Sequence, residues 1–137
     1  MHIDTKTIKL IQNQLRKASI MWHIRAEVLK EAKTRKKIGH YKNGKDKYKN
    51  KYKCACCNKL WNEEQVEVDH KIEVTHNVKT PSKMDKEDLF QWIDQLFCDK
   101  DNLQILCIGC HQAKTNNYNK SRTKAQKLIG GKRISLI

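Results

Sequence analysis

DNLQILCIGCHQAKT, residues 101–115, joins a short apolar run to a Cys-x-x-Cys pair, Cys107 and Cys110, with a histidine directly after it. A second pair, Cys54 and Cys57, lies upstream, and 49 residues separate the two pairs. Cysteine pairs at this local spacing converge on one ion and form a tetrahedral site of four sulfurs, which suits Zn²⁺. The sequence therefore predicts a structural zinc knuckle that closes around the intervening chain.

The first pair is ambiguous because Cys56 stands next to Cys57. Only Cys54 and Cys57 have two residues between them, so we assign those two as the ligands. Free buried thiols and disulfides are the alternatives for a chain with six cysteines, but the repeated spacing favours zinc. Cys98, near the end of an amphipathic segment, is interpreted as a small core residue.

The composition predicts one domain with a small core. The chain has 137 residues, 38% of them hydrophobic, and a mean hydropathy of −0.85. Domains with so little apolar surface often need a metal or disulfides to fold. No apolar leader or membrane-length run is visible, so we expect a cytoplasmic protein that does not contact a membrane.

The net charge of +14 is unevenly distributed. Residues 60–101 contain five Lys, no Arg and eleven acids, a local charge of −6, so the rest of the chain carries +20. Basic flanks around an acidic centre suit a protein that binds a polyanion outside and divalent cations inside. A uniformly basic structural protein would not need the acidic centre.

Periodicity and turn signals predict the order of the elements. We expect helices over about 5–17 and 20–36, a basic loop over 37–52, a strand over 66–74, a helix over 85–97 capped by Asp85, a turn over 99–102, a strand over 103–107 and a helix over 111–118.

The basic loop is the expected DNA contact. Residues 33–53 hold ten Lys or Arg and one acid. We predict that Lys49, Lys51 and Lys53 contact phosphates, and a solvated linker is the alternative interpretation.

Three residues carry the chemistry of phosphodiester hydrolysis, which needs an activated water and a cation at the scissile phosphate. An imidazole is substantially neutral near pH 7, so His70 can act as the general base. Asp69, its neighbour, can bind a metal, and His111 at a helix start can bring an imidazole to the same ion. Two protein ligands leave positions for water and phosphate.

Residues 68–72, VDHKI, and residues 101–115 together closely resemble the HNH endonucleases, most of all the small stand-alone bacteriophage type with four cysteines. The resemblance covers roughly residues 52–116. It implies an α+β fold with a ββα-metal (His-Me finger) core and a structural zinc knuckle, preceded by N-terminal helices and a basic loop.

The expected organisation follows from this resemblance. Residues 1–51 form an N-terminal helical, Lys-rich arm, residues 52–119 the nuclease domain with a helical insertion at about 82–98, and residues 120–137 a basic C-terminal tail.

By position, the resemblance makes His70 the general base and assigns Asp69 and His111 as ligands of a catalytic divalent cation. Asn102 matches the central Asn of the family, which braces the loop that orients the base, and in some members an Asn binds metal instead. Some members have a further His where this chain has Thr115, so tight Zn²⁺ binding at this site is not expected.

An Asp and His site with water suits Mg²⁺ or Mn²⁺, with Ni²⁺ or Co²⁺ as substitutes in vitro. Lys114 is placed either to contact DNA phosphate or to lie solvated on the helix surface.

The sequence thus predicts a metal-dependent DNA endonuclease that nicks or cuts double strands, with modest sequence specificity. By resemblance only, it would be phage-encoded, act in the host bacterial cytoplasm and work with a terminase or another packaging protein. The alternative is a zinc-knuckle DNA-binding module without cleavage. Such a module has no need of Asp69 facing phosphate.

Overall fold

The computed structural model describes residues 3–74 and 80–128, with side chains as far as residue 121, as a mixed α+β fold. The helices are α1 (Thr5–Ile20), α2 (His23–Ala32), α3 (Lys86–Leu96) and α4 (Ile108–Leu128), and the strands are β1 (Lys33–His40), β2 (Asp46–Lys53), β3 (Leu60–Trp61), β4 (Val66–His70) and β5 (Leu103–Cys107). The last part of the predicted basic tail, residues 129–137, lies outside the described residues.

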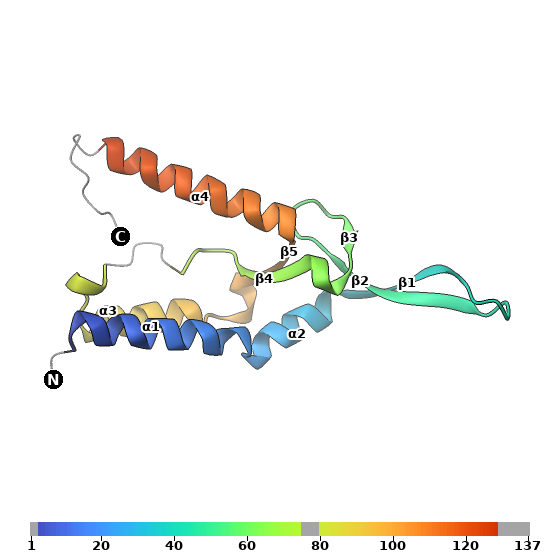
Figure 1. The fold of residues 1–137 in the computed structure, drawn as a ribbon, viewed down its shortest axis with the longest axis horizontal. Coiled ribbons are helices and arrows are strands. Elements are labelled where there is room, and N and C mark those ends of the chain that lie inside the picture. Colours follow the sequence, from blue (N-terminus) through green and yellow to red (C-terminus); the bar gives the residue numbers. More distant parts are fainter. Residues whose placement is uncertain (1–2, 75–79, 129–137) are drawn as a thin grey trace.

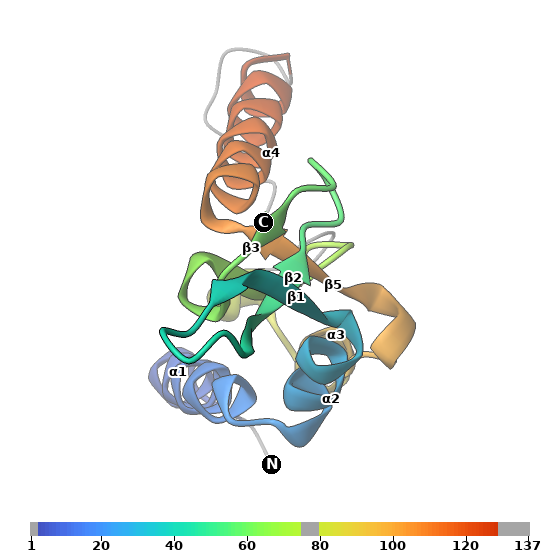
Figure 2. The same cartoon turned by 90° about the vertical axis from the view of Figure 1, so that its right-hand side faces the viewer.

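The centre of the molecule is the antiparallel pair β4–β5, with α4 following β5 directly. The pair lies between α4 on one side and α1, α2 and α3 on the other (Figures 1 and 2). In the strand register, Asp69 is opposite Gln104 and His70 is opposite Leu103. The four elements that surround this sheet therefore converge on the end of β4.

Strand β4 ends at His70, whereas the sequence predicted a strand as far as residue 74. The Lys71 N–H still donates to the Asn102 carbonyl at 2.7 Å, in register with the ladder. The pairing ends there because the Asn102 N–H donates to the Asp99 carbonyl at 2.9 Å, and the Asn102 side-chain Oδ1 accepts from the Ile72 N–H at 3.1 Å.

The predicted basic loop over 37–52 is wrong, because β1 and β2 form a long antiparallel hairpin there. Helix α2 also ends at Ala32 rather than at residue 36, and α1 and α2 are separate helices. The hairpin turns at Asn43 and Gly44, a pair typical of tight hairpins. Gly44 has φ +82°, which favours glycine, and Asn43 Oδ1 accepts from the Lys45 N–H at 3.1 Å.

Helix α3 confirms the predicted helix and its cap. Asp85 Oδ1 accepts from the Asp88 N–H at 2.8 Å, and Asp88 Oδ2 accepts from the Asp85 N–H at 3.1 Å, which is a capping box. The buried face of α3 packs against Ile8 of α1. That face consists of Leu89, Trp92 and Leu96.

A second apolar cluster joins α2 and β2 to the central sheet; its buried members are Val28, Tyr52, Val66, Leu103 and Ile105. The core is thus divided into small clusters rather than gathered in one centre.

Helix α4 begins at Ile108, three residues before the predicted start, and it continues across the expected boundary at residue 119 as far as Leu128. The early start has a local cause. Cys107 Sγ accepts from the Cys110 backbone N–H at 3.4 Å, so a cysteine sulfur takes one of the free donors of the first turn.

Candidate functional site

The four predicted zinc ligands come together at one place. The sulfurs of Cys54, Cys57, Cys107 and Cys110 all lie within 4.8 Å of one another. The loop between β2 and β3 supplies the first pair, and the junction of β5 with α4 supplies the second. The backbone N–H of Ala55 donates to the Ile105 carbonyl at 2.8 Å, which holds the two halves of the cluster together.

The backbone around Cys54 and Cys57 forms a turn that places both sulfurs on the same side. Asn58 has φ +60°, a left-handed conformation that Asn tolerates in turns, and the Cys54 N–H donates to the Lys59 carbonyl at 3.0 Å.

Backbone donors favour the thiolate form at this cluster. Burial would raise the pKa of the Cys54 thiol, but hydrogen bonds from the backbone of Cys107, Cys57 and Cys56 outweigh it and lower the pKa to about 6. Metal ligation requires thiolates, so this environment is compatible with structural zinc.

The two remaining cysteines lie outside the cluster. Cys56 is exposed, and Cys98 packs at the edge of the apolar cluster around β4 and β5. All six cysteines are free thiols. The choice of Cys57 with Cys54, and the interpretation of Cys98 as a packing residue, agree with this arrangement.

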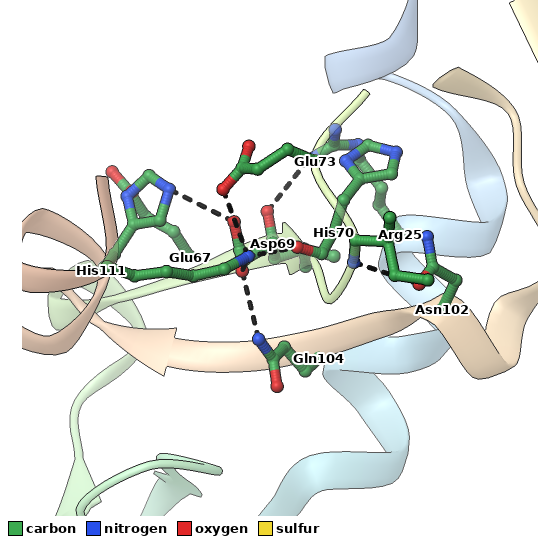
Figure 3. Close-up of polar contacts among 11 residues, drawn as sticks. Arg25, Glu67, Asp69, His70, Glu73, Asn102, Gln104 and His111 are labelled. Carbon is green, nitrogen blue, oxygen red and sulfur yellow. Dashed lines mark hydrogen bonds and ion pairs between the residues drawn. The ribbon is translucent and has the colours of Figure 1, made fainter. Parts of the chain in front are cut away.

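A second group of polar side chains lies along β4 and the first turn of α4 (Figure 3). Glu67 and Asp69 are two residues apart, so they share one face of the strand. His111 reaches both of them: its Nε2 lies 3.3 Å from Asp69 Oδ1, and its Nδ1 lies 2.7 Å from Glu67 Oε2. Both ring nitrogens of His111 therefore face a carboxylate, and the shorter contact is the one between Nδ1 and Glu67.

Asp69 is buried, and its second oxygen is fully engaged. Asp69 Oδ2 accepts from Gln104 Nε2 at 3.1 Å and from Lys114 Nζ at 2.6 Å. Lys114 also lies 3.3 Å from Glu73 Oε1 and donates to the His70 carbonyl. The Lys114 ammonium is therefore paired within the site rather than solvated, and its contact with DNA phosphate stays a prediction.

The imidazole of His70 is held from the opposite side by α3. Its Nε2 lies 2.9 Å from the Leu96 carbonyl, which can only accept, so Nε2 carries the proton. The lone pair of the neutral ring is then on Nδ1. Burial lowers the pKa of His70 below its ordinary value of 6.5, and the nearby Arg25 guanidinium lowers it further, against the raising effect of the Leu96 hydrogen bond.

Arg25 connects α2 to the same strand, because its Nη1 donates to the Val68 carbonyl at 3.0 Å. Asn102 lies behind His70 and binds the backbone of residues 71 and 72, as described above. Both contacts fix the end of β4, one from each side (Figure 3).

These side chains open onto one cavity of about 820 Å³ between the α1–α2 junction and β4. Its polar lining includes Arg25, Glu67, Asp69, His70 and His111. Ile20 and Met21 at the α1–α2 junction add an exposed apolar rim. This volume lies within the range that is typical of ligand-binding clefts.

Some residues of this site were predicted from the sequence, and others were not. Asp69, His70 and His111 are brought together, Asn102 lies directly behind them, and Lys49, Lys51 and Lys53 lie away from the site on β2. Glu67 and Gln104 were missed. The two-residue spacing between Glu67 and Asp69 was a visible signal, whereas the position of Gln104 opposite Asp69 depends on the strand register, which the sequence alone did not give. The Leu96 carbonyl could not be found from the sequence, because every residue has one.

No protein-family model matches the chain, and no curated protein or solved structure matches it either. In the part of the chain that the structure describes, no helix is long and apolar enough to cross a bilayer.

Proposed function

We propose that the chain is a metal-dependent endonuclease of the HNH type that hydrolyses phosphodiester bonds in DNA. One observation carries the proposal: Asp69 Oδ1 and His111 Nε2 lie 3.3 Å apart beside a buried imidazole whose free lone pair is on Nδ1. This is the combination that hydrolysis at a phosphate needs, a cation position next to a base.

The donor set of Asp69 and His111 fits one divalent cation. A carboxylate oxygen and an imidazole nitrogen at this separation can both bind an ion with bonds of about 2.0–2.2 Å. Glu67 orients His111, as carboxylates commonly do for metal-binding histidines. We therefore interpret β4, β5 and α4 as a ββα-metal core, with Mg²⁺ or Mn²⁺ as the ion and Ni²⁺ or Co²⁺ as substitutes in vitro.

When bound, the cation would stabilise the charge that develops on the phosphate and on the leaving 3′ oxygen. The side chains and backbone of the protein activate the water. His70 accepts the proton of the attacking water at Nδ1, while the Leu96 carbonyl keeps Nε2 protonated and the ring oriented. Because the pKa of His70 is lowered, the ring is neutral and ready to accept a proton at pH 7.

Asn102 acts as a positioning residue. It binds the backbone N–H groups of residues 71 and 72, and so sets where the strand that carries His70 ends. The role of brace, rather than metal ligand, is the one that these contacts support.

Lys114 is assigned to charge balance. Its ammonium lies between Asp69 and Glu73, so it offsets two carboxylates at the site. A contact of Lys114 with DNA phosphate stays a prediction from the sequence.

The charge of the molecule supports DNA as the substrate. The chain carries +14 overall, and Lys49, Lys51 and Lys53 lie on β2 outside the cavity. We propose that these lysines contact DNA phosphates while the cavity receives the scissile one. A role with a terminase or another phage packaging protein stays a prediction from the resemblance.

The test is cleavage of a supercoiled plasmid by zinc-loaded wild type, His70→Ala and His23→Ala. His23 is exposed and lies outside the cavity, so it is the matched control. We expect relaxation or linearisation in Mg²⁺ or Mn²⁺ for wild type and His23→Ala, a loss of at least a hundredfold for His70→Ala, and no cleavage without added cation.

Zinc content and DNA binding are measured on the same samples. His70→Ala that retains both but does not cut supports the assignment of the base. If none of the proteins cuts and all bind DNA, the chain is a zinc-knuckle binding module instead.

A further inference from the structure

The β1–β2 hairpin projects from the body of the molecule (Figure 1). Its strand register gives it two chemically different faces. Side chains alternate along a strand, and directly paired residues share a face. The register pairs Lys36 with Lys49 and Thr34 with Lys51. One face therefore gathers five lysines, which we name the lysine face: Lys36, Lys47, Lys49, Lys51 and Lys53.

The opposite face, which we name the tyrosine face, holds two cations that have partners within the hairpin. The Arg35 guanidinium lies 4.2 Å from the Tyr48 ring centroid, and Lys37 Nζ lies 3.1 Å from Asp46 Oδ1. At its base, Tyr52 is buried in the apolar cluster of α2 and the central sheet. This face stabilises the hairpin and attaches it to the core.

On the lysine face, Lys51 Nζ donates to Asn62 Oδ1 and Lys47 Nζ lies 5.5 Å from the Tyr41 ring centroid, but neither partner carries a negative charge that offsets the lysines. Within β1 and β2, both fully described, no acidic side chain lies on this face. Lys36 is directly opposite Lys49, and like charges in that position destabilise a ladder. Folding alone does not account for such a face, whereas a bound polyanion would remove the repulsion.

We infer that the lysine face is a binding surface for the phosphate backbone of double-stranded DNA, beyond the stretch that occupies the cavity. The inference rests on the proposed function for the choice of substrate. The inference adds Lys36 and Lys47 to the residues that bind DNA. It excludes Lys33, Arg35 and Lys37 from DNA binding. The composition of the segment alone could not distinguish these two groups of basic residues.

Two features favour duplex DNA over a single strand. Two residues of a strand span ~6.7 Å, so the lysine face extends over about 20 Å from Lys47 to Lys53. A DNA duplex presents about twelve phosphates along that length. Proteins that bind single strands stack bases on aromatic rings. Tyr48 and Tyr52 are on the tyrosine face, and the Tyr41 ring has Lys47 Nζ 5.5 Å from its centroid.

The test compares two triple variants of the full zinc-loaded chain that remove the same charge from the two faces. One is Lys36→Gln, Lys47→Gln and Lys49→Gln, and the other is Lys33→Gln, Arg35→Gln and Lys37→Gln. Binding to a fluorescent duplex is measured over a range of salt without Mg²⁺ or Mn²⁺, so cleavage plays no part.

The lysine-face variant should bind the duplex at least tenfold more weakly, with a salt slope lower by about 2.7, or roughly 0.9 per lysine. Its thermal midpoint should be unchanged or higher, since the repulsion between Lys36 and Lys49 is removed. The tyrosine-face variant, checked for folding by circular dichroism, should change the slope by less than a third as much. Equal losses from both faces, or no loss from the lysine face, would overturn the inference, as would tighter binding to single-stranded DNA or RNA than to the duplex.

The result of this binding test does not depend on whether the protein cleaves DNA. If wild type never cuts but the lysine-face variant alone loses duplex binding, the surface stands and the nuclease does not. If wild type cuts and the lysine-face variant binds like wild type, the nuclease stands and the surface does not.

Discussion

Asp69 is the residue at which the site is assembled. Its carboxylate is buried, and a buried charge is costly unless it is paired and hydrogen-bonded. Gln104, Lys114 and His111 each approach it from a different position on β5 or α4. The carboxylate therefore couples the strand pair to the helix and also presents an oxygen to the cavity.

Glu67 should control the orientation of His111. In Glu67→Gln the acceptor for Nδ1–H is weaker and uncharged, so binding of a catalytic cation should weaken about 10–100-fold. The measurement is Mn²⁺ titration of zinc-loaded protein by calorimetry, together with the Mn²⁺ concentration that gives half-maximal cleavage. Glu64→Gln, on the exposed turn before β4, is the matched control. Equal Mn²⁺ affinity in both variants would show that Glu67 has no such role.

The rate of cleavage should fall in acid with a midpoint below 6.5, the ordinary pKa of histidine. Burial disfavours the imidazolium of His70, so the neutral base persists to lower pH than in a free histidine. The unfolded chain takes up this proton at the higher pH, so folding also loses stability as the pH falls below 6.5. The check is kcat/KM against pH, with DNA binding measured over the same range. An acid limb centred above 6.5 would contradict the assignment of His70.

The site residues that could be predicted from the sequence are those whose side-chain type has a specific chemical use. The order of Asp69, His70, Asn102 and His111 pointed to one site because carboxylate, imidazole and amide have specific uses. The Leu96 carbonyl and the inward contact of Lys114 depend on where α3 and α4 pack, and no local signal in the sequence reports that packing.

At the scale of elements, α3 has the largest effect on the site. It packs through Trp92, which is 1% exposed, and its last residue supplies the carbonyl that binds His70. Stability and orientation of the base therefore depend on the same helix.

Trp92→Ala should destabilise the protein by about 3–5 kcal/mol, the usual cost of removing a buried aromatic side chain. Phe90→Ala, on the same helix at 62% exposure, should change stability by less than about 0.5 kcal/mol. Urea denaturation of the two variants provides the comparison. A small effect of Trp92→Ala would mean that α3 does not pack on α1 as described.

The elements were predictable where apolar periodicity is strong and not where charge dominates. Helix α3 and strand β5 have clear apolar faces, and both were predicted almost to their ends. The β1–β2 hairpin has almost no apolar residues, so its alternation was hidden by lysines, and its strand character depends on Tyr52 in the core and on the Asn43–Gly44 turn. That turn pair was the available signal, within a segment that was predicted to be a loop.

At the scale of the whole molecule, the cysteine cluster joins the loop between β2 and β3 to the junction of β5 and α4. Leu106 and Cys107 of β5 pack with Cys54, which is fully buried, and Trp61 covers the cluster from β3. Apparent zinc-binding free energies of about 10–16 kcal/mol are comparable to or larger than the ~5–15 kcal/mol stability of a typical domain. Bound zinc would therefore add strongly to the apolar contacts of Tyr52 that attach the hairpin sheet to β5.

Cys57→Ser and Cys56→Ser form a matched pair that tests this role. Cys57 belongs to the cluster, and the adjacent Cys56 is exposed and lies outside it. We expect one zinc per chain and an unchanged thermal midpoint for Cys56→Ser, and loss of zinc with cooperative unfolding at a much lower temperature for Cys57→Ser. Zinc content by atomic absorption and a thermal melt are the measurements. Equal zinc content in both variants would exclude the assigned ligand set.

The most direct test of the central claim is plasmid cleavage in Mg²⁺ by zinc-loaded wild type and Asp69→Asn, with DNA binding measured in the same samples. Asn keeps the shape of the side chain but removes the charge that would hold the cation. The account predicts that both proteins bind DNA and that only wild type cuts it. Equal cleavage by the two proteins would contradict a catalytic cation at Asp69 and His111.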